Sequence, residues 1–417
     1  MPRTYSDRAT QVIARCREIA TCTEVPGETT RLFLTSSMRK VHGLLRGWME
    51  AASMMVDVDA IGNLHGLWPG VTPGSPRLLI GSHLDTVPNA GAFDGILGVV
   101  LGLAVIEELQ GRHLPYAIEV VGFSEEEGVR FHKPFLGSLS LVGRLDPETL
   151  ALTDRDGISI TKAIQSFGLD PSQLSTAMIS DAFAYLEFHI EQGPVLESED
   201  LSLGVVEALV GQTRMRFTFT GQSNHAGTTP MRLRHDAMAA AADWIVAVED
   251  HAGSREGLVA TVGKVEASPG AGNVIAGRVV ASLDVRHIND AVRQHAVAAM
   301  TQVAEVAAAK RGVHVTAQLL LEQPAVPLNP HLTTMLQRAT AQAGIRSRVM
   351  ASGAGHDAMI LAPVIPSAML FLRSPGGLSH HPNETVQTQD VEAALHTAME
   401  FLVQLRDDRS ILKDAHA

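Results

Sequence analysis

The stretch "RLLIGSHLDTVPNAGAFDGILGVVLGLAVIEELQ", residues 77–110, decides the fold class. It starts with a short apolar run that predicts a strand and continues through a polar loop. It ends in a long apolar run at 96–110 that predicts a buried helix. A second strand that leads into a polar loop, "YAIEVVGFSEEE" at 116–127, comes next. Strands that alternate with helices predict an α/β architecture.

The segments on either side extend this pattern. They predict, in chain order, two amphipathic helices, a hairpin and a further strand: residues 8–20, 37–52, 54–68 and 185–194. The hairpin is expected to turn at Gly62-Asn63. The N-terminal half therefore predicts the strands and helices of one α/β domain.

The order of elements changes between residues 213 and 323. Four strands and two helices are expected there: strands at 213–221, 258–267, 278–287 and 313–323, and helices at 234–252 and 289–311. The order β-α-β-β-α-β is that of a ferredoxin-like domain. A proline-rich segment, "QPAVPLNP", marks the return to the first domain. We therefore expect a first domain in two segments, 1–212 and 326–417, around an inserted domain at 213–325.

Composition limits the possible partners and compartments. The 417 residues are 45% hydrophobic, enough for two domains with a large core. A formal net charge of −12 argues against nucleic acid or an anionic membrane as partner, and an anionic substrate would need a local cationic clamp. The spacing of Cys16 and Cys22 suits neither a metal site nor a necessary disulfide. With no signal peptide and no apolar run long enough to span a bilayer, we expect a cytoplasmic protein.

Polar clusters recur where the expected strands end. They contain His83 and Asp85, Asp94, Glu125 to Glu127, His189, and His380 with His381. Because His83 and Asp85 are two apart, both would face one side of a strand. Imidazoles with carboxylates and no cysteine suit zinc, manganese or cobalt, and a cation would relieve the repulsion within the glutamate run. Taken singly, Asp94 could instead be a helix N-cap, and the glutamates a solvated loop.

The motifs in their order resemble one family. They are "GSHLDTVPNAGAFDGILGV", "SEEEGVRF", "FHIEQGPVLE", "GQSNHAGTTPM", "GAGNVI", "LDVRH", "GAGHDAM" and "LSHHPNE". The series resembles the M20-type amidohydrolases, in the branch of N-carbamoyl-amino acid hydrolases, β-ureidopropionases and allantoate amidohydrolases, and spans nearly the whole chain. The resemblance implies a two-metal catalytic domain with a mixed sheet flanked by helices, plus an inserted ferredoxin-like lid that forms a homodimer.

The resemblance also implies a ligand set for two divalent ions, zinc, manganese or cobalt. His83 and His189 would each bind one metal, Asp94 would bridge both, and Glu127 would be a carboxylate ligand. The last ligand is expected to be His380 rather than the adjacent His381.

Further roles follow from the same motifs. Glu126 would be the general base, and Asp85 would orient His83. Glu125 is expected to be a solvated loop carboxylate. Substrate contacts are expected from five side chains: Gln192, His225, Asn273, Arg286 and His356. Among these, His225 would polarise the scissile carbonyl and Arg286 would bind a substrate carboxylate. A surface salt bridge of Arg286 and a helix cap by His356 are the simpler alternatives.

The resemblance implies hydrolysis of the ureido C–N bond of a carboxylated N-carbamoyl compound. The segments "ETTRLFLTSSM" and "MEAASMMVDVDAIGNLHG" resemble those of bacterial allantoate amidohydrolases more than those of carbamoylases. This resemblance favours allantoate, with ureidoglycine, ammonia and carbon dioxide as products. N-carbamoyl-L-amino acids or ureidopropionate are the alternative substrates. A peptidase or deacylase of the same superfamily and a binding protein with a relic site are the competing classes.

Overall fold

The computed structural model describes residues 4–179 and 181–408. The chain forms two compact units: unit 1 is Met1–Glu207 with Leu328–Ala417, and unit 2 is Ala208–Pro327. Unit 2 begins and ends a few residues outside the inserted segment expected at 213–325. The first three and last nine residues of the expected first domain lie outside the described residues, as does residue 180. No helix within the described ranges is long and apolar enough to cross a membrane.

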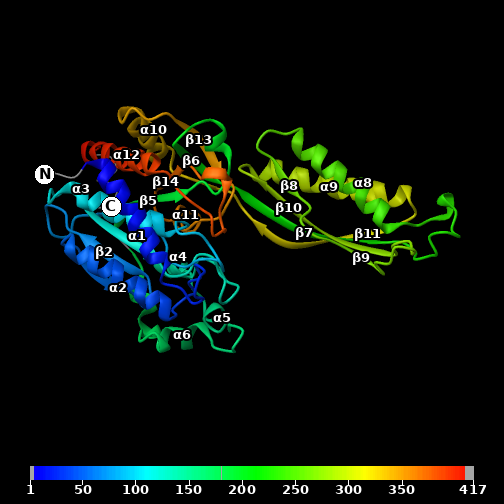
Figure 1. Cartoon of the computed structure of the whole chain (residues 1–417), viewed down its shortest axis with the longest axis horizontal. Helices are drawn as coiled ribbons and strands as arrows, with labels where there is room; N and C mark the ends of the chain where they lie inside the picture. Colours follow the sequence, from blue (N-terminus) through cyan, green and yellow to red (C-terminus); the bar gives the residue numbers. More distant parts are fainter. Residues whose placement is uncertain (1–3, 180, 409–417) are drawn as a thin grey trace. The chain divides into compact units, whose positions relative to one another are not determined.

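A mixed sheet forms the centre of unit 1 (Figure 1). Its strand order is β1-β2-β4-β3-β5-β14-β6-β12, and β13 pairs with β6. The strands are β1 Met55–Val58, β2 Leu64–Trp68, β3 Arg77–His83, β4 Ala117–Phe123, β5 Ala182–Ile190, β6 Leu203–Leu209, β12 Val326–Pro327, β13 Ser347–Ser352 and β14 Ser367–Leu372. The end of β6 and both residues of β12 are counted in unit 2. The central four, β4-β3-β5-β14, are parallel, while β1, β2, β6 and β12 pair antiparallel. The expected mixed α/β sheet is confirmed.

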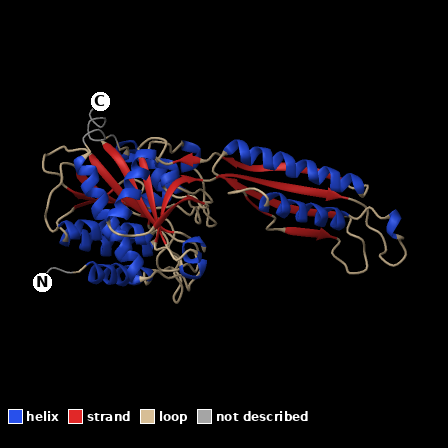
Figure 2. Ribbon diagram, turned by 90° about the horizontal axis from the view of Figure 1, so that it is seen from above, coloured by secondary structure: helices blue, strands red, loops and turns tan. Residues whose placement is uncertain are grey.

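Helices flank this sheet (Figure 2). The apolar run becomes α3, Ile96–Leu109, which packs on β3, β4 and β5. A Cβ on Gly98 would lie 2.2 Å from the Phe188 carbonyl oxygen, so glycine is required where this helix meets β5. The other helices of unit 1 are α1 Tyr5–Ala20, α2 Ser36–Ala51, α4 Leu136–Leu141, α5 Pro147–Leu150, α6 Ile160–Ser166, α7 Val195–Ser198, α10 Pro330–Gln342, α11 Ala358–Leu361 and α12 Thr388–Asp407, with 3₁₀ turns η1 Pro171–Ala177 and η3 Pro375–Gly377.

The expected hairpin near the N-terminus is present as β1 and β2, in which Val58 pairs with Leu64. The Asp59 carboxylate accepts hydrogen bonds from the backbone amides of Ile61 and Asn63. Gly62 has φ +91°, a conformation that favours glycine. The turn therefore forms at the Gly-Asn pair, as predicted.

Unit 2 has a five-stranded antiparallel sheet in the order β11-β7-β10-β8, with β9 also paired to β10. Its elements are β7 Gly211–Thr220, η2 Met231–Leu233, α8 Ala237–Gly253, β8 Val259–Thr261, β9 Val265–Ser268, β10 Arg278–His287, α9 Asp290–Lys310 and β11 His314–Gln323. Helices α8 and α9 lie side by side over one face of this sheet (Figure 1). With β8 and β9 counted together, the order matches the expected ferredoxin-like arrangement.

One expected strand of unit 2 was wrong in detail. Residues 258–267 form two short strands instead of one. Between them lies Gly263, which weakens a strand. The backbone amide of Lys264 donates to the Ser282 hydroxyl at 3.0 Å. In a regular sheet this amide would donate to a main-chain carbonyl of the neighbouring strand.

Candidate metal centre

The carboxyl ends of four adjacent parallel strands meet at one edge of the unit 1 sheet. The glutamate run follows β4, His83 ends β3, His189 lies near the end of β5, and His380 lies in the loop after β14. The spatial order β4-β3-β5-β14 therefore brings together groups that are far apart in the sequence. Asp85 lies beyond the end of β3, so the expected common strand face for His83 and Asp85 was wrong.

The two oxygens of Asp94 face different groups of donors. Oδ1 lies 3.3 Å from His189 Nε2 and 3.9 Å from His83 Nε2, and these two nitrogens are 3.4 Å apart. Oδ2 lies 3.1 Å from His380 Nε2, which is 3.4 Å from Glu127 Oε1. Ligands about 2.0–2.2 Å from one tetrahedral ion would be about 3.3–3.6 Å apart. The separations in both groups lie near this range, except the longer one between His83 and Asp94. His83, Glu126 and Glu127 form a third group of donors that could hold a metal ion.

Asp94 is buried, and the residue that follows it, Gly95, determines the course of the loop. The N-cap of α3 is Gly95, with φ +69°, and no side chain caps the helix, so the alternative of Asp94 as an N-cap was wrong. A Cβ on Gly95 would lie 2.4 Å from the His83 ring. Burial raises the pKa of Asp94. The hydrogen bond from His380 and the charges of His189 and His83 outweigh this effect, so the pKa lies well below its usual range.

Asp85 acts on the neighbouring loop. Its Oδ1 accepts from the Glu126 amide at 2.9 Å and its Oδ2 from the Glu127 amide at 3.1 Å. His83 Nδ1 lies 3.0 Å from the Asp85 main-chain oxygen and 3.5 Å from its carboxylate. The expected contact with His83 therefore runs through the main chain, while the carboxylate holds the glutamate loop.

The glutamate run is almost wholly withdrawn from water. Glu125 is fully buried, so its expected place in a solvated loop was wrong. Burial raises the pKa of Glu125 and of Glu126 well above the usual range, and the pKa of Glu127 to about 7. Such a cluster needs nearby positive charge if its members are to ionise together.

Two further polar side chains of unit 1 contact the centre. Gln192, with φ +59°, places Nε2 3.2 Å from Asp94 Oδ1 and 3.1 Å from Ser379 Oγ. The His356 ring packs 4.3 Å from the His189 ring, and its Nε2 lies 2.9 Å from Ser352 Oγ. The N-cap of α11 is Asp357, so the alternative of His356 as the helix cap was wrong.

The two adjacent histidines differ clearly. His380 has φ +55° and points Nε2 at the cluster. His381 instead accepts a hydrogen bond from the Asn383 amide through Nδ1, and it belongs to none of the metal-like donor groups among the described residues. The geometry favours His380 as the ligand.

The other expected substrate contacts belong to unit 2. His225 pairs with Val274 in an isolated bridge, and the Ala226 amide donates to the Asn273 carbonyl at 2.9 Å, so His225 and Asn273 lie on adjoining loops. Arg286 lies on β10, where Nε and Nη2 donate to the Asp284 carboxylate at 2.9 and 3.1 Å, so the salt bridge given as the simpler alternative is present.

Two buried residues near the centre were missed from the sequence. Glu384 Oε1 accepts from the amides of Phe93 and Asp94 at 2.9 and 3.0 Å, which fixes the loop that carries Asp94. Arg31 Nε donates to the Leu84 carbonyl at 2.8 Å. Glu384 ends the motif LSHHPNE, and Arg31 lies in the segment ETTRLFLTSSM. A charged residue without an assigned role in such a segment is the signal that could have drawn attention to them.

Comparisons with known proteins identify the family of the chain. The Peptidase family M20/M25/M40 matches residues 79–405. The chain is 40% identical over 383 residues to N-carbamoyl-L-amino acid amidohydrolase of Geobacillus stearothermophilus, covering 90% of this chain and 94% of the relative. It is 36% identical to allantoate deiminase 1 of Glycine max, covering 95% and 89%. An amidase of the hydantoinase/carbamoylase family from Burkholderia multivorans has a TM-score of 0.91 at 32% identity, covering 96% and 98%. The expected family is confirmed, and the chain belongs to Peptidase family M20/M25/M40.

Proposed function

We propose that this chain is a binuclear metal-dependent amidohydrolase that cleaves the ureido C–N bond of a carboxylated N-carbamoyl compound. The observation that carries the proposal is the position of Asp94, whose two oxygens face separate donor groups. His83 and His189 share one oxygen, so both belong to one ion site, while Glu127 and His380 belong to the other. Asp94 would bridge the two.

The donor set of imidazoles and carboxylates suits zinc, manganese or cobalt. Bound divalent ions supply Lewis acidity and lower the pKa of a coordinated water. Glu126 is buried beside the ligands, and the nearby cations would let its carboxylate stay ionised. Its role is to take a proton from the attacking water and to deliver it to the leaving nitrogen.

Substrate binding is proposed for the five side chains that the resemblance implies. Gln192 and His356 lie at the centre itself. His225 would donate to the carbonyl oxygen as negative charge develops, with Asn273 beside it. Arg286 already binds a carboxylate, that of Asp284, side-on with two hydrogen bonds. A substrate carboxylate would use the same guanidinium chemistry, which is the cationic clamp that an acidic chain requires.

We propose allantoate as the substrate, supported by the two N-terminal segments that favour it and by the soybean relative named allantoate deiminase 1. N-carbamoyl-L-amino acids are the second candidate because the Geobacillus relative named for them is 40% identical. The same residues would serve either compound, since both combine a ureido group with a carboxylate.

We also propose a homodimer through unit 2, in a reducing, cytoplasmic compartment. Edge strand β11 exposes Leu319, Leu320 and Leu321, which are 53, 48 and 37% accessible in the single chain. Apolar residues on a free sheet edge favour pairing with another chain. Cys16 and Cys22 are buried free thiols, which agrees with a reducing compartment.

A substrate panel tests the proposal. Allantoate, ureidopropionate, several N-carbamoyl-L-amino acids and a dipeptide would be assayed for ammonia or amine release, with and without added Mn²⁺. We expect Mn²⁺-dependent ammonia release, fastest with allantoate. Hydrolysis of the dipeptide alone would support a peptidase. No activity in a preparation that binds no cation would support a relic site.

A further inference from the structure

Arg31 is a fully buried arginine in the loop before α2. Its Nε donates to the Leu84 carbonyl at 2.8 Å. Its Nη1 and Nη2 atoms are buried and have no hydrogen-bond partner within the described part of the chain. Burying a guanidinium without pairing most of its donors is costly, so a specific electrostatic reason for this position is expected.

The main chain of Arg31 is tied to the same loop as its side chain. Its amide donates to Thr86 Oγ1 at 2.9 Å, and the Thr86 amide donates to the Arg31 carbonyl at 3.0 Å. Together with the hydrogen bond to the Leu84 carbonyl, these contacts bind the residues directly before and after Asp85. Asp85 in turn accepts from the amides of Glu126 and Glu127. Arg31 therefore fixes a loop on which the glutamate run depends.

The charge of Arg31 acts on the same region. The pKa of Arg31 is lowered to about 10, mainly by burial, and the charges of Asp85, then Cys22, Cys16 and Asp94, oppose this shift. The side chain therefore stays a cation at neutral pH, and its one side-chain hydrogen bond in the described ranges, to the Leu84 carbonyl, holds it beside Asp85.

Two other buried arginines provide a contrast. Arg293 donates to Asp290 at 2.9 Å, and Arg373 donates to Asp390 at 2.8 Å, so each is neutralised by a direct ion pair. Arg31 has no carboxylate among its hydrogen-bond partners in the described ranges. Its charge is therefore left to act at longer range, on the carboxylates of the centre.

We propose that Arg31 is a positioning residue of the metal centre: it holds the 84–86 loop and supplies a buried positive charge that offsets Asp85 and Asp94. This inference rests on the proposed function. Before divalent ions bind, the buried carboxylates repel one another, and a permanent cation reduces that repulsion. Once two divalent ions are bound, the same charge matters less for stability. Arg31 should therefore stabilise the metal-free protein more than the metal-loaded protein.

The test compares Arg31→Met, which removes the charge, with Arg31→Lys, which keeps it. The Tm of each variant is measured metal-free and with saturating Mn²⁺, with metal content from elemental analysis. The rise in Tm on adding Mn²⁺ should be larger in Arg31→Met than in wild type, and near the wild-type value in Arg31→Lys. We also expect kcat of the loaded Arg31→Met protein to fall about 10-fold or more, through the displaced loop.

Arg293→Met is the matched control because it removes a buried guanidinium from unit 2. It should lower Tm equally with and without Mn²⁺. If Arg31→Met also lowers Tm by the same amount with and without Mn²⁺, the inference is overturned. If Arg31→Met does not fold without metal, refolding in the presence of Mn²⁺ should restore the folded protein. Failure of both Arg31→Met and Arg31→Lys to fold in Mn²⁺ would also overturn the inference. Failure of the wild-type protein to bind divalent ions would count against the proposed function itself.

Discussion

Glu126 and Asp94 are both buried carboxylates at the metal centre, but the proposed function gives them different tasks. Glu126→Gln should keep both ions and lose about 10²–10⁴-fold in kcat because only a general base is removed. Asp94→Ala should lose metal and also stability because the imidazoles and Glu127 then face one another without their shared partner. Elemental analysis beside kinetics separates the two effects. Near wild-type activity of Glu126→Gln would move the base role to Glu125.

Arg286 binds Asp284 through two hydrogen bonds, a geometry that an ammonium cannot reproduce. Arg286→Lys should therefore raise KM by about 10-fold or more with a smaller change in kcat. Arg214→Lys is the control because Arg214 also donates to Asp284, at 3.0 Å, but is half exposed. A ureido compound without a carboxylate should be a poor substrate for the wild-type protein. Equal rates with and without that carboxylate would exclude the clamp.

The sequence was informative for residues whose chemistry is carried by their own side chains. Histidines and carboxylates at successive strand ends could be predicted because parallel strands end at one edge. The partners of Arg31 and Glu384 could not be predicted because these side chains bind main-chain groups 53 and 290 residues away. The burial of Glu125 was missed for a related reason: a run of three acids looks solvated until the loop is known to be held by Asp85.

Among the elements, the strands of unit 2 were predicted most closely. The strand β10 has the expected bounds, β7 differs by two residues at its start and one at its end, and β11 starts one residue late. In β7 and β10 buried and accessible residues alternate, so one face packs against helices and the other does not. Residues 258–267 were harder, because a side-chain hydrogen bond to the Lys264 amide interrupts the strand, and the sequence does not show such a contact.

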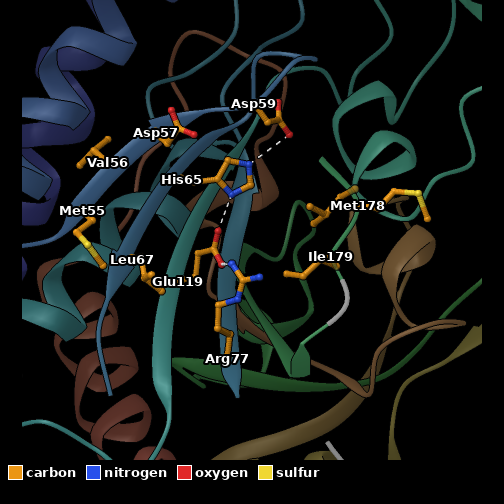
Figure 3. Close-up of a pocket in the computed structure, with 11 residues that line it drawn as sticks. Met55, Val56, Asp57, Asp59, His65, Leu67, Arg77, Glu119, Met178 and Ile179 are labelled. Carbon is orange, nitrogen blue, oxygen red and sulfur yellow. Dashed lines mark hydrogen bonds and ion pairs between the residues drawn. The ribbon is translucent and has the colours of Figure 1, made fainter. Parts of the chain in front are cut away.

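The hairpin β1–β2 and its neighbours β3 and β4 carry a second polar cluster, which shares no residue with the proposed metal ligands. Figure 3 shows His65 between Asp59 and Glu119, above Arg77. His65 Nδ1 lies 2.7 Å from Glu119 and Nε2 lies 3.3 Å from Asp59, while Arg77 donates to Glu119 at 2.6 Å. Burial opposes the charge of His65, but the hydrogen bonds to the two carboxylates raise its pKa to about 10. The cluster joins three strands through charged hydrogen bonds.

This cluster predicts a pH-dependent stability. Because the folded pKa of His65 lies above its unfolded value of about 6.5, its contribution is complete below pH 6.5 and is lost as pH rises through 10. His65→Gln should therefore lower the free energy of unfolding by about 1–3 kcal/mol at pH 6, and by less at pH 9. Urea unfolding of both proteins at the two pH values measures the difference. The same difference at both values would show that His65 acts without its charge.

At the scale of the whole molecule, the order of elements predicted an α/β unit interrupted by a ferredoxin-like unit, and the two units follow that order. The sequence could not predict which edge of unit 2 exposes apolar residues, because Leu319 to Leu321 resemble any buried strand until their neighbours are known. In the structure β11 is an edge strand that pairs only with β7. Its accessible leucines support the proposed dimer.

The resemblance implies that the lid histidine of one subunit serves the site of its partner. If so, His225 completes a centre whose ligands belong to the other chain, and Glu126→Gln and His225→Ala homodimers should each be nearly inactive. In a mixed dimer one site carries both defects. The other takes Glu126 from one chain and His225 from the other, and is complete.

Unfolding and refolding the two variants together should therefore restore activity to about a quarter of the wild-type value, since half the dimers are mixed and half of their sites are intact. The control is each variant refolded alone, which should stay inactive. A site built within one chain predicts no recovery, because every site would still lack one residue. Continued inactivity of a purified heterodimer would therefore leave His225 to its own chain, and the dimer would then contribute no residue to the site.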